Sequence, residues 1–360
     1  MKIRFGRLAQ YGACLVLTAV VPATVAAQAV ADFYKDKQMQ LVVGTDAGGG
    51  FDTYGRLLTR HIGRHIPGQP SFIVMNMPGA GSLKAANYVY GIAKQDGTVL
   101  MTVNRTAPFV QILGQPGPTF EATKFHWIGS LMNEGGVVRI WHTVPVKTIA
   151  DARKQQVILG STAAGTDTEI FPLLMNATLG TQFKIVRGYQ TGPAVDLAIE
   201  RGEIHGQADS FTSMVTRHPN WLQTFTVLTQ LSSKPQPALA NVPMIMNLLT
   251  PENLAPGVIA DEARAMWELM LALKVMGRPF AMGPGVPVER VASLRQAFRA
   301  TVADPEFRAD AAKSKMEIDP VDGDELQALM AKAAATSKPV IAKLNDSIKD
   351  KGEATDVRKR

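Results

Sequence analysis

The sequence predicts an α/β protein made of two α/β domains with a ligand cleft between them. Strand and helix signals alternate along the first third of the chain, and the alternation starts again near His126. This order is typical of mostly parallel sheets covered by helices. The chain has 360 residues, of which 46% are hydrophobic and 19% charged. It therefore has enough apolar material for large buried cores, and it is neither disordered nor fibrous.

The first alternation begins with a β-branched run at 40–45, which leads into the glycine-rich loop 47–50. Asp52 is predicted to cap the helix that follows, and Pro67 with Gly68 ends that helix. The other elements expected in this part are strands at 71–75 and 98–103 and a helix at 82–93.

From about residue 126 onward, predicted strands and helices alternate again, and the C-terminal part of the chain is predicted to be mainly helical. Asp167 is predicted to cap its central helix. The expected strands cover 126–132, 137–141, 157–160, 183–186, 203–208 and 225–231. The expected helices cover 167–179, 192–201, 262–276, 288–303 and 324–351.

The N-terminus has the pattern of a secretory signal peptide. Three basic residues within the first seven precede a short apolar run at 13–21, and Ala27 and Ala29 fit an A-x-A cleavage pattern. We expect cleavage after Ala29 or after Ala27, so that residues 1–29 form the signal peptide. An uncleaved anchor is the alternative, although the run is shorter than the ~20 residues of a membrane span. The only cysteine, Cys14, lies in this segment, so the mature chain would have no disulfide, zinc–thiolate site or cysteine nucleophile.

Composition and motifs exclude several classes of function. Lys and Arg number 38 against 31 Asp and Glu, giving a net charge of +7, but the basic residues are scattered and predict no nucleic-acid partner. No G-x-G-x-x-G, phosphate-binding P-loop or G-x-S-x-G motif occurs. His61 and His65 have the spacing of a metal pair on a helix, but no Glu beside His61 completes H-E-x-x-H, so solvated or half-buried histidines are strongly favoured over a metal site. We therefore expect no catalytic residue, metal or cofactor.

Two similar loops follow strands and open helices, at 44–49 and 160–165. Such loops bind anions, because their backbone N–H groups converge and the helix behind them adds the positive end of its dipole. Asp52 and Asp167 would hold the loops in shape. The alternative is that both are ordinary strand-to-helix turns. The ligand-binding candidates from the loops are Gly48, Gly49, Gly50, Asp52, Thr53, Ser161, Thr162, Ala163, Gly165 and Thr166.

Three further candidates lie just after predicted strands, where open α/β sheets bind ligands. Arg105 has the paired donors that match a carboxylate, with a surface salt bridge as the alternative. Tyr189 and Asp209 would contact the ligand, or else serve in packing or a turn.

An ordered set of short motifs gives the chain a resemblance to the Bug-type receptors of tripartite tricarboxylate transporters. The likeness covers about 35–330, and it departs from the family pattern at Ala47, 166–169 and 188–190. The motifs are A-G-G-G-F-D-x-x-x-R at 47–56, N-x-P-G-A-G at 76–81, D-G-T at 96–98, G-S-T-A-A-G at 160–165, R-G-Y-Q-T-G at 187–192, M-G-R-P-F at 276–280 and P-G-V-P at 284–287.

The resemblance implies a type II periplasmic-binding-protein fold. Domain one would comprise 33–130 and 230–360, and domain two 131–229. It also implies a periplasmic receptor that captures a small carboxylate between its domains and delivers it to a large and a small membrane subunit. Two other functions stay open, an exported hydrolase or transferase and a sensor that presents its ligand to a membrane kinase.

Overall fold

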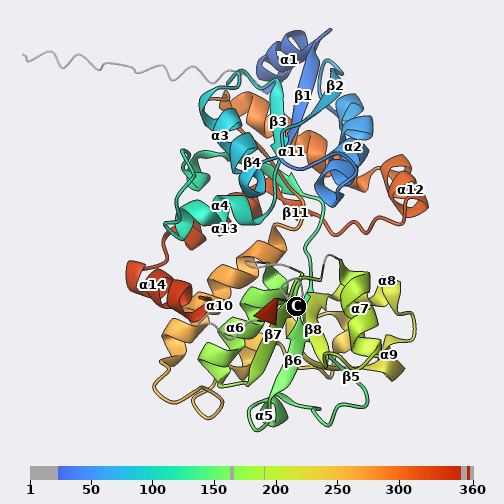
Figure 1. Cartoon of the computed structure of the whole chain (residues 1–360). Coiled ribbons are helices and arrows are strands. Elements are labelled where there is room, and N and C mark those ends of the chain that lie inside the picture. Colours follow the sequence, from blue (N-terminus) through green and yellow to red (C-terminus); the bar gives the residue numbers. More distant parts are fainter. Residues whose placement is uncertain (1–22, 163–165, 190, 350–354, 357–360) are drawn as a thin grey trace, which may run out of the picture.

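The computed structural model describes residues 23–162, 166–189, 191–349 and 355–356. Its strands form two six-stranded sheets, which lie one above the other in Figure 1. Helices cover both sheets, as the alternating sequence pattern predicts. The predicted fold class, two α/β units, is therefore confirmed.

The first sheet has the strand order β11-β4-β10-β3-β1-β2. Its three N-terminal strands are parallel, whereas β10 runs antiparallel between β3 and β4. The strands are β1 (Gln38–Val43), β2 (Ser71–Asn76), β3 (Val99–Thr102), β4 (His126–Ser130), β10 (Pro279–Met282) and β11 (Val321–Asp322).

The second sheet has the order β12-β7-β6-β8-β5-β9. Its centre is parallel, and β5 runs antiparallel to both of its neighbours. The strands are β5 (Gly136–Trp141), β6 (Val157–Gly160), β7 (Phe183–Arg187), β8 (Gly206–Ser210), β9 (Phe225–Leu231) and β12 (Thr355–Asp356).

The helices divide between the sheets, with α10, α13 and α14 at the joint (Figure 1). Those beside the first sheet are α1 (Ala23–Tyr34), α2 (Gly50–Ile62), α3 (Leu83–Gly91), α4 (Thr106–Ile112), α11 (Val288–Ala303), α12 (Pro305–Lys313) and α13 (Gly323–Ala334). Those beside the second are α5 (Ile149–Ala152), α6 (Asp167–Leu179), α7 (Gly192–Glu200), α8 (Phe211–Arg217) and α9 (Trp221–Thr224), with α10 (Ala260–Val275) and α14 (Lys338–Ser347) packed beside α6.

One apolar cluster runs from one sheet to the other through α10, α13 and α14. At its centre Trp267 of α10 stacks on Phe171 of α6, with ring centroids 5.8 Å apart, and donates a hydrogen bond to Thr178. Met330 of α13 and Leu344 of α14 belong to the same cluster. The two units therefore share a continuous core on this side.

Several sequence predictions need correction. The helix expected at 324–351 is two helices, α13 and α14, because Pro339 lacks the N–H that an unbroken helix requires and takes the first turn of α14. The helix caps expected at Asp52 and Asp167 are instead Gly49 and Thr166, and both aspartates lie inside the first turn of their helices. Sequence reasoning also missed α1, α4, α5, α8, α9, α12, β10, β11 and β12.

The chain passes from the first sheet to the second between β4 and β5, and the next strand of the first sheet after β9 is β10. The domain limits drawn at 131 and 229 stay a prediction. Both candidate cleavage sites lie within α1, and Val30 and Tyr34 beyond them are buried against the first unit.

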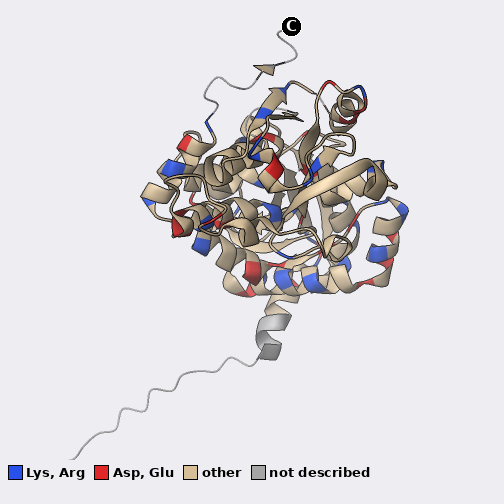
Figure 2. Cartoon of the chain, turned by 90° about the horizontal axis from the view of Figure 1, so that it is seen from below, with Lys and Arg blue, Asp and Glu red and all other residues tan. Residues whose placement is uncertain are grey.

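Charged residues of both signs are interspersed over the helices (Figure 2). Within the described residues, none of the helices has the length and apolar character that a membrane crossing requires.

The contact between β4 and α11 gives a test of the fold. Gly129 in β4 lies so close to the buried ring of Phe298 in α11 that a methyl group there would overlap the ring. We expect Gly129→Ala to lower the free energy of unfolding by about 1–3 kcal/mol through overpacking, measured by urea denaturation.

The matched control is Gly91→Ala at the end of α3, where an added methyl group meets no atom. It should leave stability unchanged or raise it slightly, because alanine reduces the freedom of the unfolded chain. Equal stability of Gly129→Ala and wild type would contradict the packing of α11 on β4.

Candidate functional site

The first glycine-rich loop joins β1 to α2 and is held by a buried carboxylate. Gly48 adopts a positive φ of 80°, and its N–H donates to Asp52 Oδ2 at 2.8 Å. Arg56 and Asn76 also donate to Asp52. Burial raises the pKa of Asp52, but these hydrogen bonds outweigh burial and hold the pKa below its usual value. Asp52 therefore supports the loop, as expected.

The other candidates of this loop differ in what they offer. The Thr53 hydroxyl donates back to the Gly49 carbonyl at 3.0 Å and is exposed. Gly48 and Gly50 are also exposed, and Gly49 is half-buried. The N–H groups of Gly48 and Gly49 are already bonded, to Asp52 and to the Asp46 carbonyl, so an anion at the N-terminus of α2 would meet the N–H groups of its first turn.

The second loop joins β6 to α6 and is lined by hydroxyl groups. Ser161 Oγ lies 2.9 Å from Thr168 Oγ1, which also lies 2.7 Å from Thr166 Oγ1. The N–H of Thr162 donates to the same Thr168 oxygen at 3.3 Å. Ala163 and Gly165, two of the predicted contacts, lie outside the described residues.

Arg105 links this loop region to the first unit. It follows β3 at the start of α4, and only 16% of its side chain is exposed. Its guanidinium pairs with Glu134 and, at 2.9 Å, with Asp167 Oδ2 at the N-terminus of α6. Arg105 thus makes salt bridges, as the alternative to a ligand contact expected, but they are largely buried and join the two units instead of lying on the surface.

Lys274 of α10 completes this ion-pair cluster. Its side chain is 3% exposed, and its ammonium lies 2.6 Å from Asp167 Oδ2 and 5.3 Å from the ring centroid of Phe171. Burial lowers the pKa of Lys274, and the charge of Asp167 offsets part of that effect. Burial would raise the pKa of Asp167, but Lys274 and Arg105 outweigh it and hold that pKa well below its usual range.

Asp209, at the end of β8, belongs to a second cluster of buried charges. Its carboxylate accepts from Arg217 at 2.6 Å and lies 3.0 Å from Arg139, whose side chain is fully buried. Asp196 pairs with both arginines. Tyr189, which follows β7, packs against the apolar cluster beneath α7. Asp209 therefore holds buried cations and also lines the small cavity, Tyr189 packs on an apolar cluster, and a ligand contact by either residue stays a prediction.

Sequence reasoning missed the cation that this structure leaves without an acidic partner. Arg278 lies just before β10, and its guanidinium carbon is 4.9 Å and 5.0 Å from the ring centroids of Phe51 and Tyr54. Nη1 donates to the Gly277 carbonyl, but Nε is buried without a hydrogen-bond partner among the described residues. Nη2 faces Gly50, where an added Cβ would lie 3.2 Å away.

Arg278 is also electrostatically unsatisfied. Burial, with the nearby charge of Arg105, lowers its pKa to about 10, so it stays charged at neutral pH. The described residues give it no ion pair. The only sequence signal for it was the M-G-R-P-F motif, which carries no chemical pattern of its own.

Two cavities are lined by these charged side chains. One of about 120 Å³ is lined by the Arg105–Asp167–Lys274 cluster. The other, of about 260 Å³, is lined by Tyr54, Arg278 and residues along the length of α8. Glu134 and Ser210 line both cavities. The candidate site is therefore the space around Glu134, between Arg278 and the ion-pair cluster.

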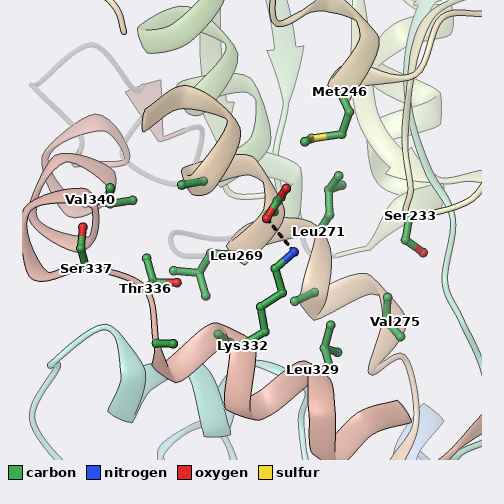
Figure 3. A pocket seen from close by; sticks show the side chains of 15 residues that line it. Ser233, Met246, Leu269, Leu271, Val275, Leu329, Lys332, Thr336, Ser337 and Val340 are labelled. Atoms are coloured by element: carbon green, nitrogen blue, oxygen red, sulfur yellow. Dashed lines mark ion pairs between the residues drawn. The ribbon is translucent and has the colours of Figure 1, made fainter. Parts of the chain in front are cut away.

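A larger cavity of about 550 Å³ lies between α10 and the α13–α14 pair (Figure 3). Its walls are mostly apolar, and its charged residues, Glu268 and Lys332, pair with each other at 2.8 Å near the surface. It has no unsatisfied charge, so it is not the candidate anion site.

The histidine pair of α2 has carboxylate partners. His61 lies 2.9 Å from Asp310, and His65 lies 2.8 Å from Asp304. Across the described ranges no group of three His, Cys, Asp or Glu residues has the arrangement of a metal site.

No family model and no curated protein matches the chain. Solved structures do match it. A TctC solute-binding protein from Polaromonas is 20% identical, covers 87% of this chain and 99% of its own, and gives a TM-score of 0.67. The periplasmic binding protein BugD is 18% identical, with coverage of 87% and 98% and a TM-score of 0.56. MatC from Rhodopseudomonas palustris with bound malate is 18% identical, with coverage of 87% and 99% and a TM-score of 0.54. The chain has the fold of these binding proteins.

The ion pairs of Asp167 predict a pH dependence. Its folded pKa lies below the unfolded value of about 3.9, so ionised Asp167 stabilises the fold above that pH and loses this effect as the pH falls through the folded pKa. We expect Asp167→Asn to lower the free energy of unfolding by about 1.5–3 kcal/mol at pH 7. The difference from wild type should shrink below pH 4, as measured by urea denaturation at several pH values.

The control is Glu200→Gln at the exposed end of α7, which should change stability by less than about 0.5 kcal/mol. A difference between Asp167→Asn and wild type that stayed constant from pH 7 to pH 3 would contradict the ion-pair assignment.

Proposed function

We propose that the chain is an exported solute receptor, which captures a small carboxylate-containing ligand between its two units and delivers it to a tripartite tricarboxylate-type membrane transporter. In this proposal it is a periplasmic binding protein and not an enzyme. The fold it shares with TctC and BugD supports the binding role. The malate held by MatC supports a carboxylate as the ligand class.

The observation that carries the proposal is Arg278. A half-buried guanidinium without an acidic partner is costly unless an anion neutralises it. The rings of Phe51 and Tyr54 flank the cation but provide no negative charge to pair with it. Arg278 lines the larger cavity, and guanidinium donors match the geometry of a carboxylate.

The loop beside Arg278 adds to the same preference. Nη2 faces Gly50 at the first turn of α2, so the guanidinium and the helix N-terminus favour negative charge in one place. A hydrogen bond to a charged group contributes about 1.5–3 kcal/mol, and a partly buried helix terminus up to ~2 kcal/mol. Micromolar affinity corresponds to about 8 kcal/mol. Arg278 with several backbone donors reaches that range.

The remaining parts of the proposal concern export and partners. The N-terminal segment would be removed after Ala29 or Ala27. Cleavage after Ala29 keeps Val30 and Tyr34 in the core, and mass analysis of the periplasmic protein identifies the site. The large and small membrane subunits would receive the ligand, as the resemblance implies. The loop candidates and Arg105 stay part of the proposed binding region.

We expect Arg278→Gln to weaken ligand binding by at least tenfold, about 1.4 kcal/mol, because glutamine keeps the polarity but loses the charge and the paired donors. A thermal-shift panel of mono- and dicarboxylic acids first identifies the best ligand. Calorimetric titration with that acid then measures both proteins.

Arg299→Gln is the matched control, since this arginine of α11 is 47% exposed and lies outside the cavities. It should bind like wild type. Unchanged affinity in a folded Arg278→Gln would remove Arg278 from the site. Turnover of the bound acid to a product would favour the enzyme, and ligand-dependent activation of a membrane kinase would favour the sensor.

A further inference from the structure

We infer that the site selects carboxylates that carry a single negative charge. This inference rests on the proposed function, because it concerns the ligand of the same cavities. It depends on which cations around these cavities already have a carboxylate partner. A ligand anion can compensate only a charge that the protein has left over.

The buried cations of the smaller cavity are already compensated. Arg105 pairs with Glu134 and Asp167, and Lys274 pairs with Asp167. Two positive and two negative side chains therefore meet here, each with less than a third of its side chain exposed. A ligand carboxylate could reach Arg105 only by displacing one of these acids.

The second cluster is balanced in the same way. Arg217, which lines the larger of the two cavities, pairs with Asp196 at 2.5 Å and with Asp209 at 2.6 Å. Arg139 pairs with the same two aspartates. These two arginines and two aspartates leave no net charge for a ligand.

Arg278 alone among the described buried cations of these cavities has no carboxylate partner. Lys315 and Glu317 also line the larger cavity, but both are exposed and have opposite charges. Exposed charges are screened by water and contribute little to binding. The cavities thus hold one uncompensated positive charge.

A second carboxylate on the ligand would find no buried cation left to compensate its charge. Glu134 is buried and lines both cavities, so it stands between Arg278 and the ion-pair cluster. Asp167 and Asp209 line the space beyond it. A second carboxylate would therefore be buried beside carboxylates that already hold the cations here, and the cost of a charge without a partner discriminates against such a ligand.

The test compares each diacid with its own monomethyl ester, which keeps the chain and one carboxylate. The probes are succinate with monomethyl succinate and adipate with monomethyl adipate. Each is titrated calorimetrically into the wild-type protein at pH 7. We expect at least one ester to bind, and to bind at least tenfold more tightly than its diacid.

Glu134→Gln then asks whether Glu134 excludes the second carboxylate. Removing its charge frees one side of Arg105, so the diacid should gain at least tenfold in affinity while the ester changes by less than threefold. Glu317→Gln is the control, the same substitution at the exposed rim of the larger cavity, and it should change neither affinity. If Glu134→Gln does not fold, Asp167→Asn replaces it in the same titrations, since it leaves Lys274 without its acid and Arg105 with only Glu134.

The outcomes separate this inference from the proposed function. Tighter binding of an ester, with a gain for the diacid in Glu134→Gln, supports the inference. A diacid that binds the wild type as tightly as its ester overturns the inference and leaves carboxylate binding intact. No binding of any of the four probes at millimolar concentration, in a protein that also binds no acid of the panel, overturns both.

Discussion

Between the two sheets, the way the segments pack depends on how their buried charged side chains are paired. Arg105 reaches from the end of β3 to Glu134, in the segment between β4 and β5, and to Asp167 at the start of α6. Lys274 reaches the same aspartate from α10. An unpaired charge here would cost several kcal/mol. The four side chains therefore fix how the segments carrying them meet, and their pairing decides which cations remain for a ligand.

The two halves of the interface differ in their physics. On one side a continuous apolar cluster joins the sheets through α10, α13 and α14. On the other side the contact is made by ion pairs and by small cavities next to Arg278. Apolar contacts tolerate small displacements, whereas ion pairs depend on geometry and on exclusion of water. A bound anion would therefore alter the contacts of the charged side more than those of the apolar side.

The sequence was sufficient for features that depend on local signals. The helix at 167–179 was predicted with its observed bounds, because Thr166 and Asp167 stand at its start and Gly180 at its end. Apolar, β-branched runs likewise indicated β1 to β9, and their alternation with helix signals indicated the α/β class. Arg105 was singled out because it follows a predicted strand, and ligands of open α/β sheets bind at the carboxyl ends of the strands.

Contacts between distant segments escaped that reasoning. Lys274 and Asp167 are 107 residues apart, and nothing near Asp167 shows that α10 supplies its partner. Arg278 contacts rings of α2 because β10 enters the first sheet between β3 and β4, in the antiparallel direction. The pattern of apolar residues in a strand does not show which strands lie beside it in the sheet. The sequence therefore indicated Arg278 only as part of the M-G-R-P-F motif.

Helix α10 connects the two kinds of interface within one element. Lys274 lines the small charged cavity, whereas Leu271 and Val275 line the large apolar cavity on the other face of the helix (Figure 3). Trp267 anchors the same helix to α6 through its stacking on Phe171. Asp167 lies on α6, so a movement of the paired helices α6 and α10 against α13 would carry Lys274 and Asp167 together, relative to Arg105 of the first unit. The balance of charge at the site is therefore coupled to the packing of α10, through a helix rather than through a flexible loop.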